Sequence, residues 1–148
     1  VAAVRAKMPE NLVNAGEEVE LTFKPGAAFG TGEHSTTQLC CQALRRILIS
    51  RCIDRDRDSS TSRLTVLDYG SGSGVLAFTA LHFGADKAVG VELDPEALNI
   101  SMVNAEVNGL SRNFVPMSPE KEALQPKQYP IVVANILTPI IVELSDML

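Results

Sequence analysis

Five residues near the middle of the chain could together bind a ligand that contains a ribose. Gly70, Gly72 and Gly74 alternate with serines, and Asp68 comes shortly before them. Glycines at this spacing allow positive φ angles and let the backbone approach a ligand closely. Glu92 lies near the end of the next apolar segment, where a carboxylate can accept hydrogen bonds from both ribose hydroxyls. The pattern therefore predicts a turn that binds a nucleoside.

The same glycines fit two classes of cofactor. Gly72, Gly74 and Ala77 satisfy the loose form of the nicotinamide dinucleotide fingerprint. The alternating glycines with Asp68 before them instead resemble the turn of class I methyltransferases, which bind S-adenosylmethionine, a sulfonium that needs no pyrophosphate cradle. We favour the second interpretation. Asp68 either interacts with the cationic end of this ligand or accepts backbone N–H bonds that stabilise the turn.

Strands and helices alternate along the chain in an order that would bring these residues to one edge of a sheet. Apolar segments with strand-like composition lie at 64–68, 88–93, 114–117 and 131–137. The last of them is almost continuously apolar, which is typical of a parallel strand buried on both faces. The alternation predicts an α/β fold with a Rossmann-like, doubly wound, mostly parallel sheet. Such sheets bind ligands beyond the carboxyl ends of their strands, near the switch in strand order.

Local signals mark the ends of the helices between these strands. Gly84 is expected to end a helix that begins at Val75. Asp94 is expected to cap a second helix, with Pro95 in its first turn. Thr138 is expected to open a further helix after the last strand.

A longer helix is expected upstream, capped by Ser35 or Thr36 and running to about Ser50. Five apolar positions at helical spacing would face the core: Leu39, Ala43, Leu44, Ile47 and Leu48. Residues 51–63 mix charges with Ser and Thr and predict a solvated connector. A short strand is expected around 19–23.

The composition argues against several classes of function. The net charge is −5, from 13 basic and 18 acidic residues, so the chain lacks the positive surface that gives proteins most of their affinity for nucleic acids. No apolar run is long enough to span a membrane. The three cysteines lack the spacing of zinc ligands and fit reduced thiols in the cytoplasm. A mitochondrial or plastid location is the alternative, if an upstream targeting segment has been removed.

Three segments in a fixed order carry a resemblance to a known family. They are 28–37, 68–74 and 132–137. Their residues and order resemble the PrmA family, whose members use S-adenosylmethionine to methylate amino groups of the ribosomal protein at the base of the stalk. By matching position, the resemblance assigns cofactor contacts to Thr37, Gly70, Glu92 and Asn135.

The chain departs from the usual residues of this family at three positions. Glu92 stands where the family usually has Asp, which keeps the carboxylate and adds one methylene. Ser71 replaces a usual Cys and is expected to act mainly through its backbone. Pro130 replaces an Asp before the last strand, where a missing N–H is tolerated. We expect the cofactor site to survive all three changes.

Two further residues have a chemical interpretation. Asn135 follows an apolar strand, where an unpaired amide is costly and where the methyl group of the cofactor is expected. Asn135 is therefore the candidate catalytic residue, which would orient the substrate amine for direct in-line transfer without a metal. Phe29 either packs on the cofactor adenine or the substrate, or fills the core. The strand exit lacks the Pro-Pro-aromatic motif of enzymes that methylate a flipped base, which disfavours a nucleobase substrate.

The resemblance leaves the acceptor and the completeness of the domain open. Electron-transfer-flavoprotein lysine methyltransferases have similar motifs, so a lysine of a non-ribosomal protein is one alternative acceptor. A non-catalytic cofactor-binding fragment is the other alternative, because class I methyltransferases have seven strands and fewer are recognisable here. We expect residues 25–148 to form an incomplete methyltransferase domain and residues 1–24 to be the remainder of a linker to a substrate domain. The strand at 131–137 would then lie at an exposed sheet edge. The sequence gives no signal of oligomeric state.

Overall fold

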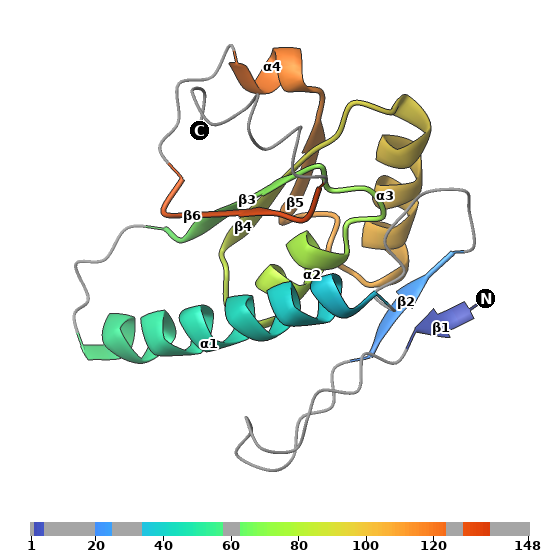
Figure 1. Ribbon diagram of the computed structural model, residues 1–148. Coiled ribbons are helices and arrows are strands. Elements are labelled where there is room, and N and C mark those ends of the chain that lie inside the picture. The colour runs from blue at the N-terminus through green and yellow to red at the C-terminus, as the bar shows by residue number, and fades with distance from the viewer. Residues whose placement is uncertain (1, 5–19, 25–33, 58–62, 124–128, 137–148) are drawn as a thin grey trace.

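Four parallel strands form the sheet that carries the glycine turn (Figure 1). They are β3 (Thr65–Tyr69), β4 (Lys87–Val91), β5 (Phe114–Met117) and β6 (Ile131–Ala134). Their spatial order is β5-β4-β3-β6, and each neighbouring pair is parallel. The chain moves outward from β3 to β5 and then returns to the other side of β3. The strand order therefore switches beside β3, directly before the glycine turn, as the sequence predicts.

Helices lie on both faces of this sheet. The computed structural model describes residues 2–4, 20–24, 34–57, 63–123 and 129–136. The helices there are α1 (Ser35–Arg57), α2 (Val75–His82), α3 (Pro95–Val107) and α4 (Pro119–Ala123). Figure 1 shows α1 and α2 below the sheet and α4 above it. Residues of α1, α2 and α3 share one apolar cluster with the sheet, so these three helices cover the same face.

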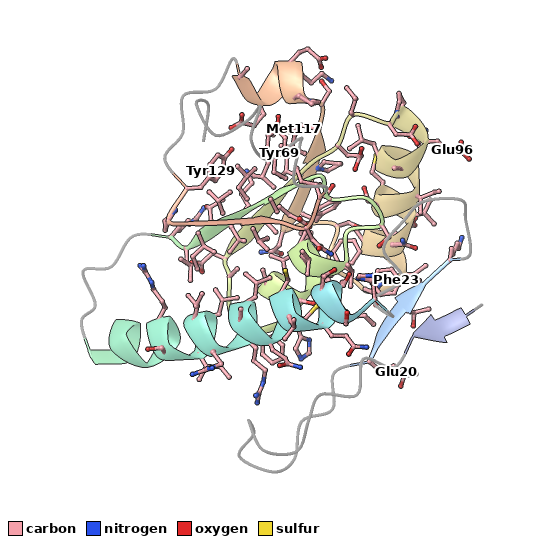
Figure 2. The ribbon with its side chains drawn as sticks, in the orientation of Figure 1. Glu20, Phe23, Tyr69, Glu96, Met117 and Tyr129 are labelled. Carbon is pink, nitrogen blue, oxygen red and sulfur yellow. The ribbon has the colours of Figure 1, made fainter. Side chains whose placement is uncertain are left out.

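The alternation of side chains along each strand separates the two faces of the sheet. Val66 and Phe114 point toward α1 to α3 and belong to the larger core cluster. Leu67 belongs to a second cluster on the opposite face, together with Met117 and the half-buried Tyr69. Figure 2 shows Tyr69 and Met117 on the side of the sheet where α4 lies. The expected α/β fold with a parallel sheet is confirmed.

The predicted ends of α2 and α3 are confirmed. α2 begins directly after Gly74, and Gly84 beyond its last turn has a φ of 101°. The side chain of Asp94 caps α3 by accepting a hydrogen bond from the backbone N–H of Glu96 at 2.9 Å. Pro95 is the first residue of α3. These boundaries were predictable because a cap depends on residues only a few positions apart.

The prediction for α1 was wrong in its length and in part of its buried face. The helix continues to Arg57 instead of ending at about Ser50, so the expected connector starts as helix. Leu39 and Ile47 are 63% and 44% exposed, and Ala43 is also exposed. Within residues 35–51, the buried positions are Thr37, Cys41, Leu44, Arg45 and Leu48. They form a stripe at helical spacing that turns Leu39, Ala43 and Ile47 away from the sheet.

The last strand is shorter and less buried than predicted. β6 ends at Ala134, and Val132 is 43% exposed. β6 lies at the edge of the described sheet, paired only with β3 among the described strands, so the expected edge position is confirmed and the expected burial on both faces is wrong. Leu137 and the helix expected at Thr138 lie outside the described residues.

A small antiparallel pair packs beside α3. β1 (Ala2–Val4) pairs with β2 (Leu21–Phe23), and β2 contains residues of the strand predicted around 19–23. The ring centroids of Phe23 and Phe78 (α2) are 6.1 Å apart, and this stacking joins β2 to the main core. The sequence prediction included neither β1 nor α4. No helix in the described ranges is both long and apolar enough to cross a membrane.

Candidate functional site

The glycine turn at 70–74 joins β3 to α2, and its backbone requires glycine. Gly70, Gly72 and Gly74 have φ angles of 76°, 51° and 90°, in the left-handed region that costs other residues free energy. The N–H groups of Gly70 and Ser71 donate to the carbonyl of Val91 at 2.8 and 3.0 Å. The turn is therefore held against the end of β4 and presents its backbone beyond the carboxyl ends of the strands.

Neighbouring side chains also exclude a Cβ atom from two positions of this turn. A Cβ on Gly70 would overlap the side chain of Ile136, which follows β6. A Cβ on Gly74 would lie 2.5 Å from the ring of Phe78. Two of the glycines are thus required by the packing of the protein itself, besides any ligand.

Glu92 lies directly beyond β4, and its carboxylate binds the backbone of the glycine turn and of the two residues that follow Glu92. One oxygen accepts a hydrogen bond from Gly72 N at 2.9 Å. The other accepts from Leu93 N at 2.8 Å and Asp94 N at 3.1 Å. A carboxylate has about four acceptor positions, so these three bonds leave room for a ligand hydroxyl. Glu92 therefore orders the glycine turn in addition to its predicted role toward a ribose.

Asp68 is buried beneath the turn, with 1% of its surface exposed. Oδ2 accepts a hydrogen bond from Ala77 N at 3.0 Å, which supports the turn-stabilising interpretation. Oδ1 is buried and has no hydrogen-bond partner among the described residues. Burial raises the pKa of Asp68 from 3.8 to about 7, the bond from Ala77 opposes this shift, and the charge of Glu92 adds to it. Oδ1 therefore has capacity for a further hydrogen bond beneath the turn.

This pKa makes the stability of the chain depend on pH in a direction opposite to that of a salt-bridged carboxylate. Because the folded state holds the proton of Asp68 up to about pH 7, stability falls as the pH rises from about 4 to 7, by at most about 4 kcal/mol from this group. We expect Asp68→Asn to remove this component, so that the variant gains stability over the parent chain as the pH rises. Thermal melts at pH 5 and pH 8 measure the effect. An equal difference between the two proteins at both pH values would contradict it.

Thr37 and Asn135 meet although 98 positions separate them in the sequence. Thr37 lies in the first turn of α1 and is buried, and Asn135 directly follows β6. The amide Nδ2 of Asn135 donates to the hydroxyl of Thr37 at 2.9 Å. The half-buried amide therefore has the partner that its position requires. With its nitrogen committed to Thr37, the carbonyl oxygen of the Asn135 side chain is left as an acceptor.

The predicted cap of α1 was wrong, because His34 caps the helix in place of Ser35 or Thr36. His34 directly precedes α1, and its ring Nδ1 accepts a hydrogen bond from the backbone N–H of Thr36 at 3.3 Å. The backbone carbonyl of His34 accepts from Gln38 N at 3.1 Å. His34 thus caps the helix that places Thr37. Phe29 lies outside the described residues.

Sequence reasoning missed Gly90 in the middle of β4. A Cβ there would lie 2.7 Å from the ring of Phe114 and 2.9 Å from the hydroxyl of Ser71. Gly90 therefore makes room for the glycine turn against the sheet. A glycine inside an apolar strand is itself a sign of such a close approach. The Ser71 hydroxyl is buried and has no hydrogen-bond partner among the described residues.

No metal centre is found in the described part of the chain, where no three His, Cys, Asp or Glu side chains cluster in a way that could hold an ion. Cys40 and Cys41 are free thiols. Cys41 lies 3.4 Å from the hydroxyl of Thr79, and burial raises its pKa. These cysteines pack in or beside the core.

Comparisons with known proteins agree with this geometry. The family model for ribosomal protein L11 methyltransferase (PrmA) matches residues 3–148. The ribosomal protein L11 methyltransferase of Citrifermentans bemidjiense is 41% identical over 131 residues, which are 88% of this chain and 40% of that protein. The enzyme of the same name from Chromobacterium violaceum is 42% identical over 134 residues, again covering 40% of its length. The chain thus spans about 40% of these curated relatives.

Solved structures show the same fold. The crystal structure of ribosomal protein L11 methylase from Lactobacillus delbrueckii subsp. bulgaricus superimposes with a TM-score of 0.66 and 29% identity, over 88% of this chain and 60% of that chain. An RNA methyltransferase from Salinibacter ruber, solved with S-adenosyl-L-homocysteine, has a TM-score of 0.52 at 18% identity. The second similarity concerns the fold alone.

Proposed function

The chain belongs to the ribosomal protein L11 methyltransferase (PrmA) family, and we propose that it forms the S-adenosylmethionine-binding core of an enzyme that methylates amino groups of a ribosomal protein. The pairing of Thr37 with Asn135 carries this proposal. It joins two residues that the family resemblance assigns to the cofactor, at the switch in strand order beside the glycine turn. A nicotinamide dinucleotide site has no need of this pair.

The residues of the site fit the proposed cofactor. Glu92 has acceptor capacity left for a ribose hydroxyl, and the positive φ angles of the turn expose backbone to the ligand. Asp68 holds a buried, unpaired oxygen beneath the turn, which suits the cationic part of the ligand. When bound, S-adenosylmethionine supplies a methyl group on a sulfonium, which needs no metal for its transfer.

Asn135 is proposed to orient the acceptor amine. Because Nδ2 donates to Thr37, the side-chain oxygen can accept an N–H of the incoming amine and direct its lone pair. A lysine has an ordinary pKa of about 10.4, and an apolar environment favours the neutral, nucleophilic form. The chain therefore contributes positioning and desolvation, and it forms no covalent intermediate.

Removal of the Thr37 hydroxyl tests this role. In Thr37→Val the Asn135 amide loses its partner and can rotate, so we expect kcat for methyl transfer to fall about tenfold, by more than the cofactor Kd rises. Thr37→Ser keeps the hydroxyl and should restore most of kcat. Single-turnover transfer and calorimetric titration measure the two quantities. A change in Kd with unchanged kcat would instead make Thr37 a cofactor contact alone.

The function itself is tested by separate calorimetric titrations of the chain with S-adenosylmethionine and NAD. We expect only S-adenosylmethionine to bind, and radiolabelled methyl groups to reach purified ribosomal protein L11 when the full-length enzyme is used. Binding of NAD alone would refute the proposal. Cofactor binding without transfer to any protein would indicate a non-catalytic binding module. Transfer to electron-transfer flavoprotein and not to L11 would identify the alternative acceptor. The cytoplasmic location remains a prediction.

A further inference from the structure

Two asparagines near the end of α3 bind β2 or the residue that follows it: Asn104 in the helix and Asn108 at its C-cap. The Asn104 side chain is fully buried, with 0% of the residue exposed. Its Nδ2 donates to the carbonyl of Ser73 in the glycine turn at 3.1 Å, and its Oδ1 accepts from Lys24 N at 2.9 Å. A single amide thus joins the glycine turn to the residue that follows β2.

The carbonyl that Asn104 binds belongs to the peptide group before Gly74. The N–H of this same peptide group donates to the carbonyl of Ser71 at 2.8 Å, so both of its polar ends have partners. Gly74 has a φ of 90°, and a peptide group beside such a residue can rotate at little steric cost. The hydrogen bond from Asn104 opposes that rotation. If the peptide group rotated, the buried Ser73 carbonyl and the buried Asn104 amide would lose each other as partners.

We propose that Asn104 is a positioning residue of the cofactor site. It fixes the orientation of the Ser73–Gly74 peptide, and with it the backbone of the turn that faces the ligand. Through its hydrogen bond with Lys24 N it also ties this turn to the end of β2. This proposal rests on the proposed function for one point, which is that the ligand is S-adenosylmethionine. The contacts of Asn104 lie within the chain and do not depend on it.

Asn108 provides a matched comparison one helical turn later. Its side chain accepts from Thr22 N at 2.9 Å and donates to Thr22 O at 2.8 Å, as a neighbouring strand would. It also donates to the backbone carbonyl of Asn104 at 2.7 Å. None of its hydrogen bonds reaches the glycine turn. Asn108 therefore secures β2 with the same chemistry but without a direct contact to the site.

The substitutions Asn104→Asp and Asn108→Asp separate the two roles. Each variant keeps a side-chain oxygen that can accept the backbone N–H, from Lys24 at position 104 and from Thr22 at position 108. Each variant loses the N–H donor of the amide. We expect both variants to melt at lower temperature, and Asn104→Asp to lose more, because its carboxylate is fully buried whereas residue 108 is half-buried. Only Asn104→Asp should weaken S-adenosylmethionine binding, by about tenfold, since its new carboxylate oxygen faces the carbonyl of Ser73. Calorimetry at a temperature where both variants are folded makes the comparison.

The backbone amide resonances of Gly72 and Gly74 report on the turn without any ligand. They should shift in Asn104→Asp and stay in place in Asn108→Asp. If Asn104→Asp does not fold, Asn104→Ser carries the same comparison. The inference would be overturned if the Asn104 variant bound S-adenosylmethionine as tightly as the parent chain and its Gly72 and Gly74 resonances did not shift. If the parent chain binds no S-adenosylmethionine, the proposed function fails, whereas the resonances still decide whether Asn104 sets the turn.

Discussion

Replacing Gly74 by alanine is expected to lower the free energy of unfolding by about 3 to 5 kcal/mol, which corresponds to a loss of about 10 °C in melting temperature. Two costs add. Alanine pays about 1 to 2 kcal/mol to adopt the φ of 90° that Gly74 has. The added Cβ would also lie 2.5, 2.8 and 3.0 Å from three ring atoms of Phe78.

The ring of Phe78 has no room to move away from this methyl group. It is fully buried, stands edge-on to Phe114 at 5.1 Å between centroids, and stacks near Phe23 at 6.1 Å. A clash with a confined aromatic ring forces the backbone to shift, and that backbone is the glycine turn. We therefore expect cofactor binding to be lost together with stability.

Gly109→Ala is the matched control for this substitution. Gly109 has a φ of 70°, and a Cβ there would meet no atom within 4 Å. It should therefore show only the backbone cost, with cofactor affinity unchanged. Chemical denaturation of both variants measures the difference. If the two alanines were equally destabilising, the contact with Phe78 would have no energetic role.

The second large effect concerns the ligand. Glu92→Ala is expected to weaken S-adenosylmethionine binding at least about 100-fold, because a charged acceptor of ribose hydroxyls contributes on the order of 3 kcal/mol. The same substitution leaves Gly72 N without its carboxylate partner, so the turn also loses order. Calorimetric titration of folded protein, with circular dichroism to verify the fold, measures the loss.

Two variants identify the origin of that loss. Glu92→Asp keeps a carboxylate for the ribose but is one methylene shorter, so it should bind the cofactor within about tenfold of the parent chain while loosening the contact to Gly72 N. Glu106→Ala removes an exposed carboxylate of α3 and should leave affinity unchanged. Parent-like binding by Glu92→Ala would remove Glu92 from the cofactor site.

Both predictions concern a turn that the protein holds in place before any ligand binds. The carbonyl of Val91, the carboxylate of Glu92 and the amide of Asn104 each bind a different backbone group of 70–74. Such preorganisation reduces the entropy cost of binding, because the backbone is already ordered. Substitutions that never touch the ligand should therefore still change its affinity.

The amino-acid sequence determined the features that depend on neighbours along the chain. Asp94 with Pro95, and Gly84 after α2, predicted helix ends that the structure confirms, since caps act over a few residues. The strand at 114–117 and the glycine turn were predictable for the same reason. The buried face of α1 was not predictable from the sequence. Leu39, Ala43 and Ile47 also recur at helical spacing, and only packing against the sheet selects which stripe is buried.

Only the tertiary structure decided which distant residues meet at the site. Nothing in the spacing of Thr37 and Asn135 predicts their hydrogen bond, because it requires α1 to cover one face of the sheet and β6 to return beside β3. The contact of Asn104 with Ser73 likewise follows from the packing of α3 beside the turn. The sequence specified glycines that permit the turn and an acid that can accept a ribose. The fold supplied the hydrogen bonds that hold them, since such bonds depend on distances in space and not along the chain.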